Sequence, residues 1–322
     1  MNGGVNRRTL LSGAAALSLR AAQTGSPMTI VDTHIHLFDT TRSQGVPWPN
    51  KDNAILYRPA LPDRYRKIAT PLGVRGAIVV ECSPWFEDNQ WVLDLAATDP
   101  IIVGSVGNLE PGKAGFGGQL DRFRKNPLFR GIRYGNLWRR NIGEELSSAE
   151  FVAGLKHLAD AGMVLDTANP NAALIAAVLR LTDKVPNLRV VIDHLPRLDP
   201  PVEAPARSIY YDNLRELGKR PQVYVKVSGV LRRLDSGVPG DLSFYKPVLD
   251  ELWDVFGQDR LIYGSDWPNS DQWGEYDKEL RIVREYFVGK GAAAMEKYFW
   301  KNSVAAYRWL RRDSTQPDPV SV

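Results

Sequence analysis

Short apolar runs rich in β-branched residues recur eight times along the chain, and amphipathic stretches of helical periodicity lie between most of them. This alternation predicts βαβ units and a parallel sheet. A count of eight favours closure into a (β/α)8 TIM barrel, an α/β fold for which 322 residues is an ordinary length. An open doubly wound sheet is the alternative, but the sequence lacks the Gly-rich phosphate loop that usually follows an early strand of such a sheet. The expected strands are Thr29–His36, Gly76–Glu81, Ile101–Val106, Phe129–Tyr134, Met163–Thr167, Leu188–His194, Gln222–Ser228 and Arg260–Asp266.

The barrel is expected to occupy residues 28–312 as one domain, because no linker or internal repeat divides this part of the sequence. Residues 37–62 are rich in Pro, Trp and Asn, and we expect this insertion after the first strand to cover the barrel mouth. The polar residues 313–322 are expected to form a flexible C-terminal tail. Helices are expected over Asn89–Ala97, Phe151–Ala161, Ala172–Thr182, Ile209–Gly218 and Tyr245–Phe256.

Residues 1–27 resemble a twin-arginine export signal. Arg7 and Arg8 precede a short apolar stretch that runs from Leu10 to Leu19. The match is partial, because Arg20 follows this stretch directly and no Ala-x-Ala cleavage site is evident. From the paired arginines and the apolar stretch we expect a periplasmic protein cleaved before about Met28. The alternative is a cytoplasmic protein with a disordered N-terminal tail.

Charge and cysteine content narrow the classes of partner. The chain has 41 Lys and Arg residues against 37 Asp and Glu residues, but residues 1–27 contribute three arginines and no acid, so the barrel is near neutral. A near-neutral body without long basic runs argues against nucleic-acid binding. The barrel also lacks the run of about 18 apolar residues that a membrane span needs. The single cysteine, Cys82, excludes an intramolecular disulfide and a cysteine-based zinc site. A small-molecule substrate is the expected partner, and a homo-oligomer is left open.

Three of the four histidines lie at the ends of expected strands. Strand alternation places Asp32, His34 and His36 on one side of the first strand, toward the barrel interior. Two adjacent imidazoles can hold a cation or polarise a carbonyl group, and the alternative is a pair of hydrogen-bonded structural histidines. His157 lies opposite the apolar face of its expected helix, so it is expected to be solvated.

Two further strand ends carry candidate groups. His194 ends an apolar strand, and Asp266 ends another between Ser265 and Trp267. Functional residues of a TIM barrel lie at the C-terminal ends of its strands. Asp266 can bind a metal or take a proton from a nucleophilic water. The alternatives are a structural role for His194 and a helix N-cap for Asp266.

Together these motifs resemble the amidohydrolase superfamily, in its amidohydrolase-related branch. The resemblance covers residues 28–312 and rests on four segments, Val31–His36, Gly131–Arg133, Val191–His194 and Gly264–Pro268. It implies a (β/α)8 barrel with its catalytic residues around one reacting centre, where they would also hold a bound metal. These residues are His34, His36, His194 and Asp266.

The sequence departs from the metal-rich members of the superfamily, which place a His on strand 5 and often a Lys or Glu on strand 4. Strand 5 here ends with Val164–Thr167 and strand 4 with Ile132–Tyr134, so a binuclear metal centre is not expected. The remaining pattern resembles the lactonases of the branch, which hydrolyse sugar-acid lactones, muconolactones or pyrone carboxylates. This resemblance implies one divalent ion, with zinc the first candidate, or a site that needs no metal.

Five residues near strand ends are candidates for substrate binding: Arg133, Glu81, Trp85, Lys226 and Trp267. Arg133 resembles an arginine that holds an anionic or polar substrate in the lactonases, and the alternative is a salt bridge to an acid such as Glu81. Lys226 resembles the lysine of a Lys-x-Ser-Gly stretch common in the family. The indole rings of Trp85 and Trp267, like those of Trp48 and Trp138, can stack on a sugar or lactone ring or can cover the core.

The expected function is therefore hydrolysis of a lactone, the cyclic ester of a sugar acid or related carboxylic acid. His34, His36 and His194 would polarise the carbonyl group directly or through one divalent metal ion, and Asp266 would activate water. A metal-dependent decarboxylase of the same branch is one alternative, which the missing strand 5 histidine disfavours. A non-catalytic periplasmic binding protein on the same barrel is another, which the complete set of four residues disfavours.

Overall fold

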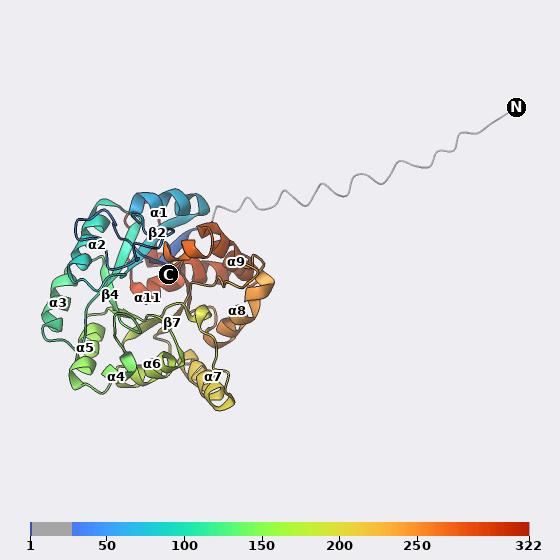
Figure 1. The fold of residues 1–322 in the computed structure, drawn as a ribbon. Coiled ribbons are helices and arrows are strands. Elements are labelled where there is room, and N and C mark those ends of the chain that lie inside the picture. The colour runs from blue at the N-terminus through green and yellow to red at the C-terminus, as the bar shows by residue number, and fades with distance from the viewer. Residues whose placement is uncertain (2–27, 322) are drawn as a thin grey trace.

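The computed structural model describes Met1 and residues 28–321, so the expected export signal lies outside the described residues. Eight parallel strands form one sheet in the order β1 to β8, with helices around it (Figure 1). Past the end of β8 the sheet closes, because the Asp266 amide donates to the His34 carbonyl (2.8 Å) and the His36 amide donates to the Trp267 carbonyl (2.7 Å). The predicted (β/α)8 barrel is confirmed. Its strands are β1 Ile30–Ile35, β2 Val74–Val80, β3 Ile102–Gly107, β4 Phe129–Arg133, β5 Val164–Asp166, β6 Arg189–Ile192, β7 Val223–Val227 and β8 Leu261–Tyr263.

Helices fill the connections between the strands, and the five predicted helices are all present with their ends shifted by a few residues. Two of them begin where a polar side chain satisfies a free backbone amide: Ser148 accepts from the third residue of α5, and Asn171 does so for α6. The helices are α1 Pro62–Ala69, α2 Glu87–Thr98, α3 Phe116–Phe123, α4 Ile142–Glu145, α5 Ala149–Asp160, α6 Ala172–Lys184, α7 Ala204–Gly218, α8 Leu242–Phe256, α9 Tyr276–Val288, α10 Ala292–Glu296 and α11 Asn302–Tyr307. None in the described part is long and apolar enough to cross a membrane.

Two strands end two or more residues earlier than the sequence predicted. β6 ends at Ile192 and β8 at Tyr263, so His194 and Asp266 lie beyond the regular strands. Both residues adopt left-handed backbone conformations, with φ of 56° and 58°. A strand cannot continue through such a conformation, which is uncommon outside glycine and is frequent at functional sites. The turns therefore set the direction of both side chains.

Strand alternation also fails within β1. The pairing of β1 with β2 shifts register after Asp32. Asp32 consequently faces the outer helices, where it accepts from the hydroxyls of Tyr65 in α1 (2.8 Å) and Tyr276 in α9 (2.9 Å). His34 and His36 remain on the interior side. The expectation that Asp32 shares their side is therefore wrong, because a bulge adds a residue between them.

The N-terminal end of the barrel is covered by the C-terminal part of the chain, whose helix α11 lies near the centre of the ring in Figure 1. A small apolar cluster inside the barrel joins strand residues such as Val31 and Val191 to Tyr307 and Trp309. The flexibility of the C-terminal tail stays a prediction, but one of its side chains packs against the barrel. Gln316 is 3% exposed, and its amide donates to the Pro100 carbonyl just before β3 (2.7 Å).

Candidate active site

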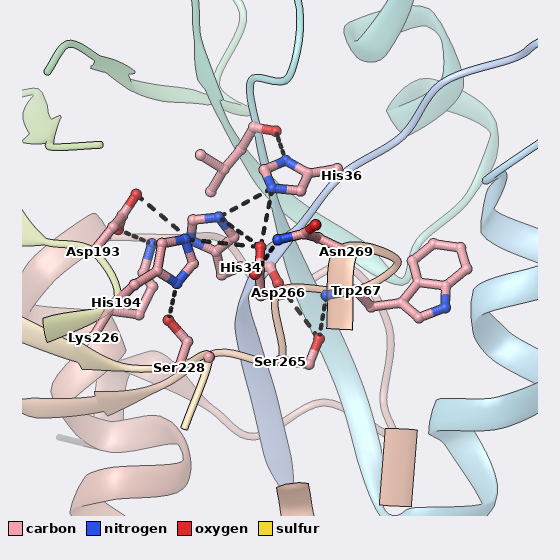
Figure 2. Close-up of polar contacts among 12 residues, drawn as sticks. His34, His36, Asp193, His194, Lys226, Ser228, Ser265, Asp266, Trp267 and Asn269 are labelled. Carbon is pink, nitrogen blue, oxygen red and sulfur yellow. Dashed lines mark hydrogen bonds and ion pairs between the residues drawn. The ribbon is translucent and has the colours of Figure 1, made fainter. Parts of the chain in front are cut away.

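Three imidazoles converge on one carboxylate oxygen at the C-terminal ends of the strands (Figure 2). The Nε2 atoms of His34, His36 and His194 lie 3.7, 3.3 and 3.7 Å from Oδ1 of Asp266. None of the four residues is more than 4% exposed. Residues from β1, the end of β6 and the end of β8 thus form one site, and the structure brings together all four that the sequence selected.

The Asp266 carboxylate uses its two oxygens differently. Oδ2 accepts hydrogen bonds from Arg197 and from Asn269, each at 2.7 Å. Oδ1 is buried and has no hydrogen-bond donor among the described residues. The Asp266 side chain does not cap the short 3-10 turn at Asn269–Gln272. The N-cap alternative is therefore wrong, and Oδ1 is free to take a proton or bind a cation.

Burial and neighbouring charges set the protonation of the site. Burial lowers the pKa of His34 and of His194 well below the usual value, so both rings are neutral near pH 7. Burial by itself raises the pKa of Asp266, but the Arg197 guanidinium opposes it, and the pKa of Asp266 lies well below its usual range. The site therefore presents an ionised carboxylate to neutral imidazoles.

A layer of paired charges lies beneath the imidazoles. The ammonium group of Lys226 is fully buried and contacts Asp166 at 2.8 Å and Asp193 at 2.9 Å. Asp193 also pairs with Arg133 at 3.1 Å. Burial raises the pKa of Asp166 to about 7, against the opposing effect of Lys226. Arg133 from β4 and Asp166 from β5 belong to this layer, and neither strand carries a histidine.

A cavity of about 190 Å³ opens above Asp266. Arg133 lines it, as expected, but its salt bridge is to Asp193, and it contacts Glu81 only through the main-chain carbonyl (3.2 Å). The predicted insertion contributes Trp48 to the wall. The lining residues are His36, Trp48, Cys82, Arg133, Leu137, Trp138, Asn169, His194, Arg197, Asp266 and Asn269.

Four predicted substrate-binding residues do not line this cavity. Glu81 and Trp85 line a neighbouring cavity, and the carboxylate of Glu81 accepts from the Trp138 indole (3.2 Å). Lys226 lies in the charged layer below. The indole of Trp267 points away from the site in Figure 2 and packs on Tyr65. Substrate binding by these four residues stays a prediction that the lining of this cavity does not support.

The residues that sequence reasoning missed are Arg197, Asn269 and Asp193. Arg197 and Asn269 follow the catalytic candidates by three residues, in the loops after β6 and β8. Loops at this end of a TIM barrel carry functional residues. Their position in such loops is the sequence signal that could have identified Arg197 and Asn269. Asp193 lies within the segment Val191–His194, but sequence reasoning assigned no role to its side chain. His157 lies outside the site, with a 42% exposed side chain that pairs with Asp121, as expected.

The donor set fits one divalent ion. His34 and His36 Nε2 atoms are 3.3 Å apart, and each lies within 3.7 Å of Asp266 Oδ1. Zinc bonds of about 2.0–2.1 Å in a tetrahedral site space the ligand atoms by about 3.3 Å. The unpaired Oδ1 supplies the negative charge that such an ion requires. Among the described residues, His34, His36 and Asp266 form one candidate group, and His34, Asp193 and His194 form a second.

An α/β barrel with imidazoles and an unpaired carboxylate at its C-terminal face defines a hydrolase-type site that acts on a small molecule. Comparison with known families agrees. The amidohydrolase family model matches residues 31–309, and the chain belongs to this family. The expected superfamily and branch are thereby confirmed.

Named relatives and solved structures share most of the chain. An L-fucono-1,5-lactonase of Burkholderia ambifaria is 27% identical over 89% of this chain and 98% of its own length. A second, from Burkholderia multivorans, is 25% identical over 85% and 94%. A zinc-bound amidohydrolase structure from Burkholderia multivorans has a TM-score of 0.77 at 23% identity, covering 88% of this chain and all of that one. At this identity the likeness concerns the fold.

Replacing Asp266 with Asn tests the role of the free carboxylate oxygen. The amide keeps the size of the side chain but cannot accept a proton as a base, so kcat should fall by about a hundredfold or more. Because the depressed pKa means that ionised Asp266 stabilises the fold, the variant should also melt lower at pH 7. This difference should shrink as the pH falls below about 4. A kcat of the Asp266→Asn variant equal to that of the parent protein would rule out Asp266 as the general base.

Replacing Arg197 with Met should move the acid limb of the pH–rate profile. Arg197 lowers the pKa of Asp266, so its loss should raise that pKa, and the base should become available only at higher pH. The kcat/KM profile, measured from pH 8 down to below the pKa of Asp266, checks the shift. Arg207→Met, on the exposed side of α7, removes the same charge and is the control. An acid limb at the same pH in the Arg197→Met variant and in the parent would show that Arg197 does not lower the pKa of Asp266.

Proposed function

We propose that this protein hydrolyses a lactone of a sugar acid or a related carboxylic acid. The observation that carries the proposal is the buried, unpaired Oδ1 of Asp266, which faces three imidazoles at the floor of a cavity. Opening a cyclic ester needs a base for water and donors for the developing oxyanion. The site offers both within one small volume.

Each step can be assigned to a group on this chain. Asp266 takes a proton from water as the water oxygen bonds to the lactone carbonyl carbon. Negative charge then develops on the carbonyl oxygen, where an imidazole N–H can donate to it. The ring C–O bond breaks, and the proton held by Asp266 passes to the leaving alkoxide. Arg197 and Asn269 hold Asp266 in place throughout through its other oxygen.

The metal belongs to the same proposal. His34, His36, His194 and Asp266 would hold the ion, and zinc suits their imidazole and carboxylate donors. A bound divalent ion would polarise the carbonyl group as a Lewis acid. One zinc-bound structure among the similar folds supports zinc as the first candidate.

Three features support a sugar-acid lactone as the substrate class. The curated relatives matched over most of the chain are named L-fucono-1,5-lactonases. The indoles of Trp48 and Trp138 line the cavity and can stack on the apolar face of a sugar ring. Arg133 adds a cationic donor in the same wall. A 4-sulfomuconolactone hydrolase of Rhizobium radiobacter, 34% identical over 25% of this chain, is also named for lactone hydrolysis.

A panel of compounds tests the proposed function. Purified protein, with and without added zinc, should open five- or six-membered sugar-acid lactones and release one proton per turnover, followed with a pH indicator. The Asp266→Asn variant measures spontaneous opening. Carbon dioxide from a dihydroxybenzoate would instead indicate a decarboxylase, whose fold is also similar (TM-score 0.61). Binding of a lactone without turnover would indicate a binding protein. Either result would overturn the proposal.

We further propose that the protein is exported to the periplasm. The support is the paired Arg7-Arg8 and the apolar stretch behind it. In the native host, fractionation should recover the protein outside the cytoplasm with its N-terminus near Met28. Replacing both arginines with lysines should retain it in the cytoplasm, because twin-arginine signals are read by a dedicated receptor. A full-length cytoplasmic parent protein would contradict the proposal.

A further inference from the structure

Lys226 lies directly under the imidazoles and outside the cavity (Figure 2). Its side chain comes from β7 and is 0% exposed. The ammonium nitrogen contacts three groups: Asp166 Oδ2 at 2.8 Å, Asp193 Oδ1 at 2.9 Å and His34 Nδ1 at 3.1 Å. The two carboxylates are the partners of the buried ammonium group. Of the residues that converge on Asp266, Lys226 contacts His34.

The chemistry of the ammonium group fixes the direction of the bond to His34. An ammonium has three N–H donors and no acceptor, so Nδ1 of His34 must accept. A ring that accepts at Nδ1 is neutral and carries its proton on Nε2. This Nε2 lies 3.3 Å from His36 Nε2. His36 donates from Nδ1 to the Val80 carbonyl (2.9 Å), which leaves Nε2 as the acceptor in the neutral form of the ring. In that form the hydrogen bonds run in one direction, from Lys226 to Val80.

This tautomer has two consequences at the site. An Nε2–H group can donate to an oxygen that develops negative charge. A metal ion, in contrast, binds the lone pair of a neutral imidazole nitrogen. For Nε2 of His34 to become a ligand, its proton must move to Nδ1, which faces the Lys226 ammonium. Asp193 Oδ2, at 3.6 Å from Nδ1, is the acceptor available to that form.

We propose that Lys226 is a positioning residue that holds His34 as an N–H donor and weakens metal binding at its Nε2. The donor role rests on the proposed lactone hydrolysis, whereas the tautomer and the metal affinity do not. In this arrangement Lys226 sets the balance between a metal-free and a metal-loaded site. A protein without this lysine would favour the form with the proton on Nδ1 and would bind a divalent ion more tightly.

Nitrogen NMR on the full chain, stripped of metal, tests the tautomer directly. Long-range ¹⁵N–¹H spectra distinguish a protonated from an unprotonated ring nitrogen, and four histidines are few enough to assign by substitution. His34 in the parent should show a protonated Nε2 and an unprotonated Nδ1. A protonated Nδ1 in the zinc-free parent would overturn the proposal without any variant.

Zinc affinity supplies the second measurement. Asp166→Asn combined with Lys226→Met removes the ammonium together with one facing carboxylate, and Asp166→Asn alone is the matched control. The double variant should bind zinc about tenfold or more tightly than the control, the scale typical of groups that orient metal ligands. Its His34 should carry the proton on Nδ1 before zinc is added. Equal zinc affinities and an unchanged tautomer would overturn the proposal. If the double variant fails to fold, the parent spectrum decides.

Discussion

The closure of the barrel between its first and last strands is the constraint on which the site depends. The amides of Asp266 and His36 bond across this seam to the carbonyls of His34 and Trp267. The same four-residue junction carries two imidazoles and the Asp266 carboxylate. The backbone bonds that complete the sheet therefore also set the distance between this carboxylate and the imidazoles, and fold stability and site geometry are coupled.

Charge balance is the second condition of the site. A carboxylate with one free oxygen is costly to bury, and here Arg197 compensates it from above. Below the imidazoles, Lys226 and Arg133 face Asp166 and Asp193 in a buried layer. His34 and His194 lie between these layers as neutral rings. Their role as donors or ligands is consequently decided by hydrogen bonds rather than by net charge.

The fold and the central residues were predictable because they follow from local rules. Eight apolar runs with helical stretches between them indicate a barrel, and functional groups cluster at the strand ends. The substrate wall was predicted less well. Arg133 lines the cavity, but Trp267 turns toward α1 and Lys226 lies underneath. The direction of a side chain alternates predictably along a strand, whereas the direction of a side chain in the following turn depends on contacts with other segments.

The sequence by itself determined the eight-stranded α/β architecture and the identity of the four residues at its centre, since periodicity and strand-end position are local properties. Only the tertiary structure decided which atoms meet. It placed Arg197 on one oxygen of Asp266 and left the other free, and it turned Asp32 outward through a bulge. It also brought Lys226 under His34 across 192 positions of sequence. Such contacts join distant strands, and their geometry is set by barrel closure and packing rather than by any local pattern.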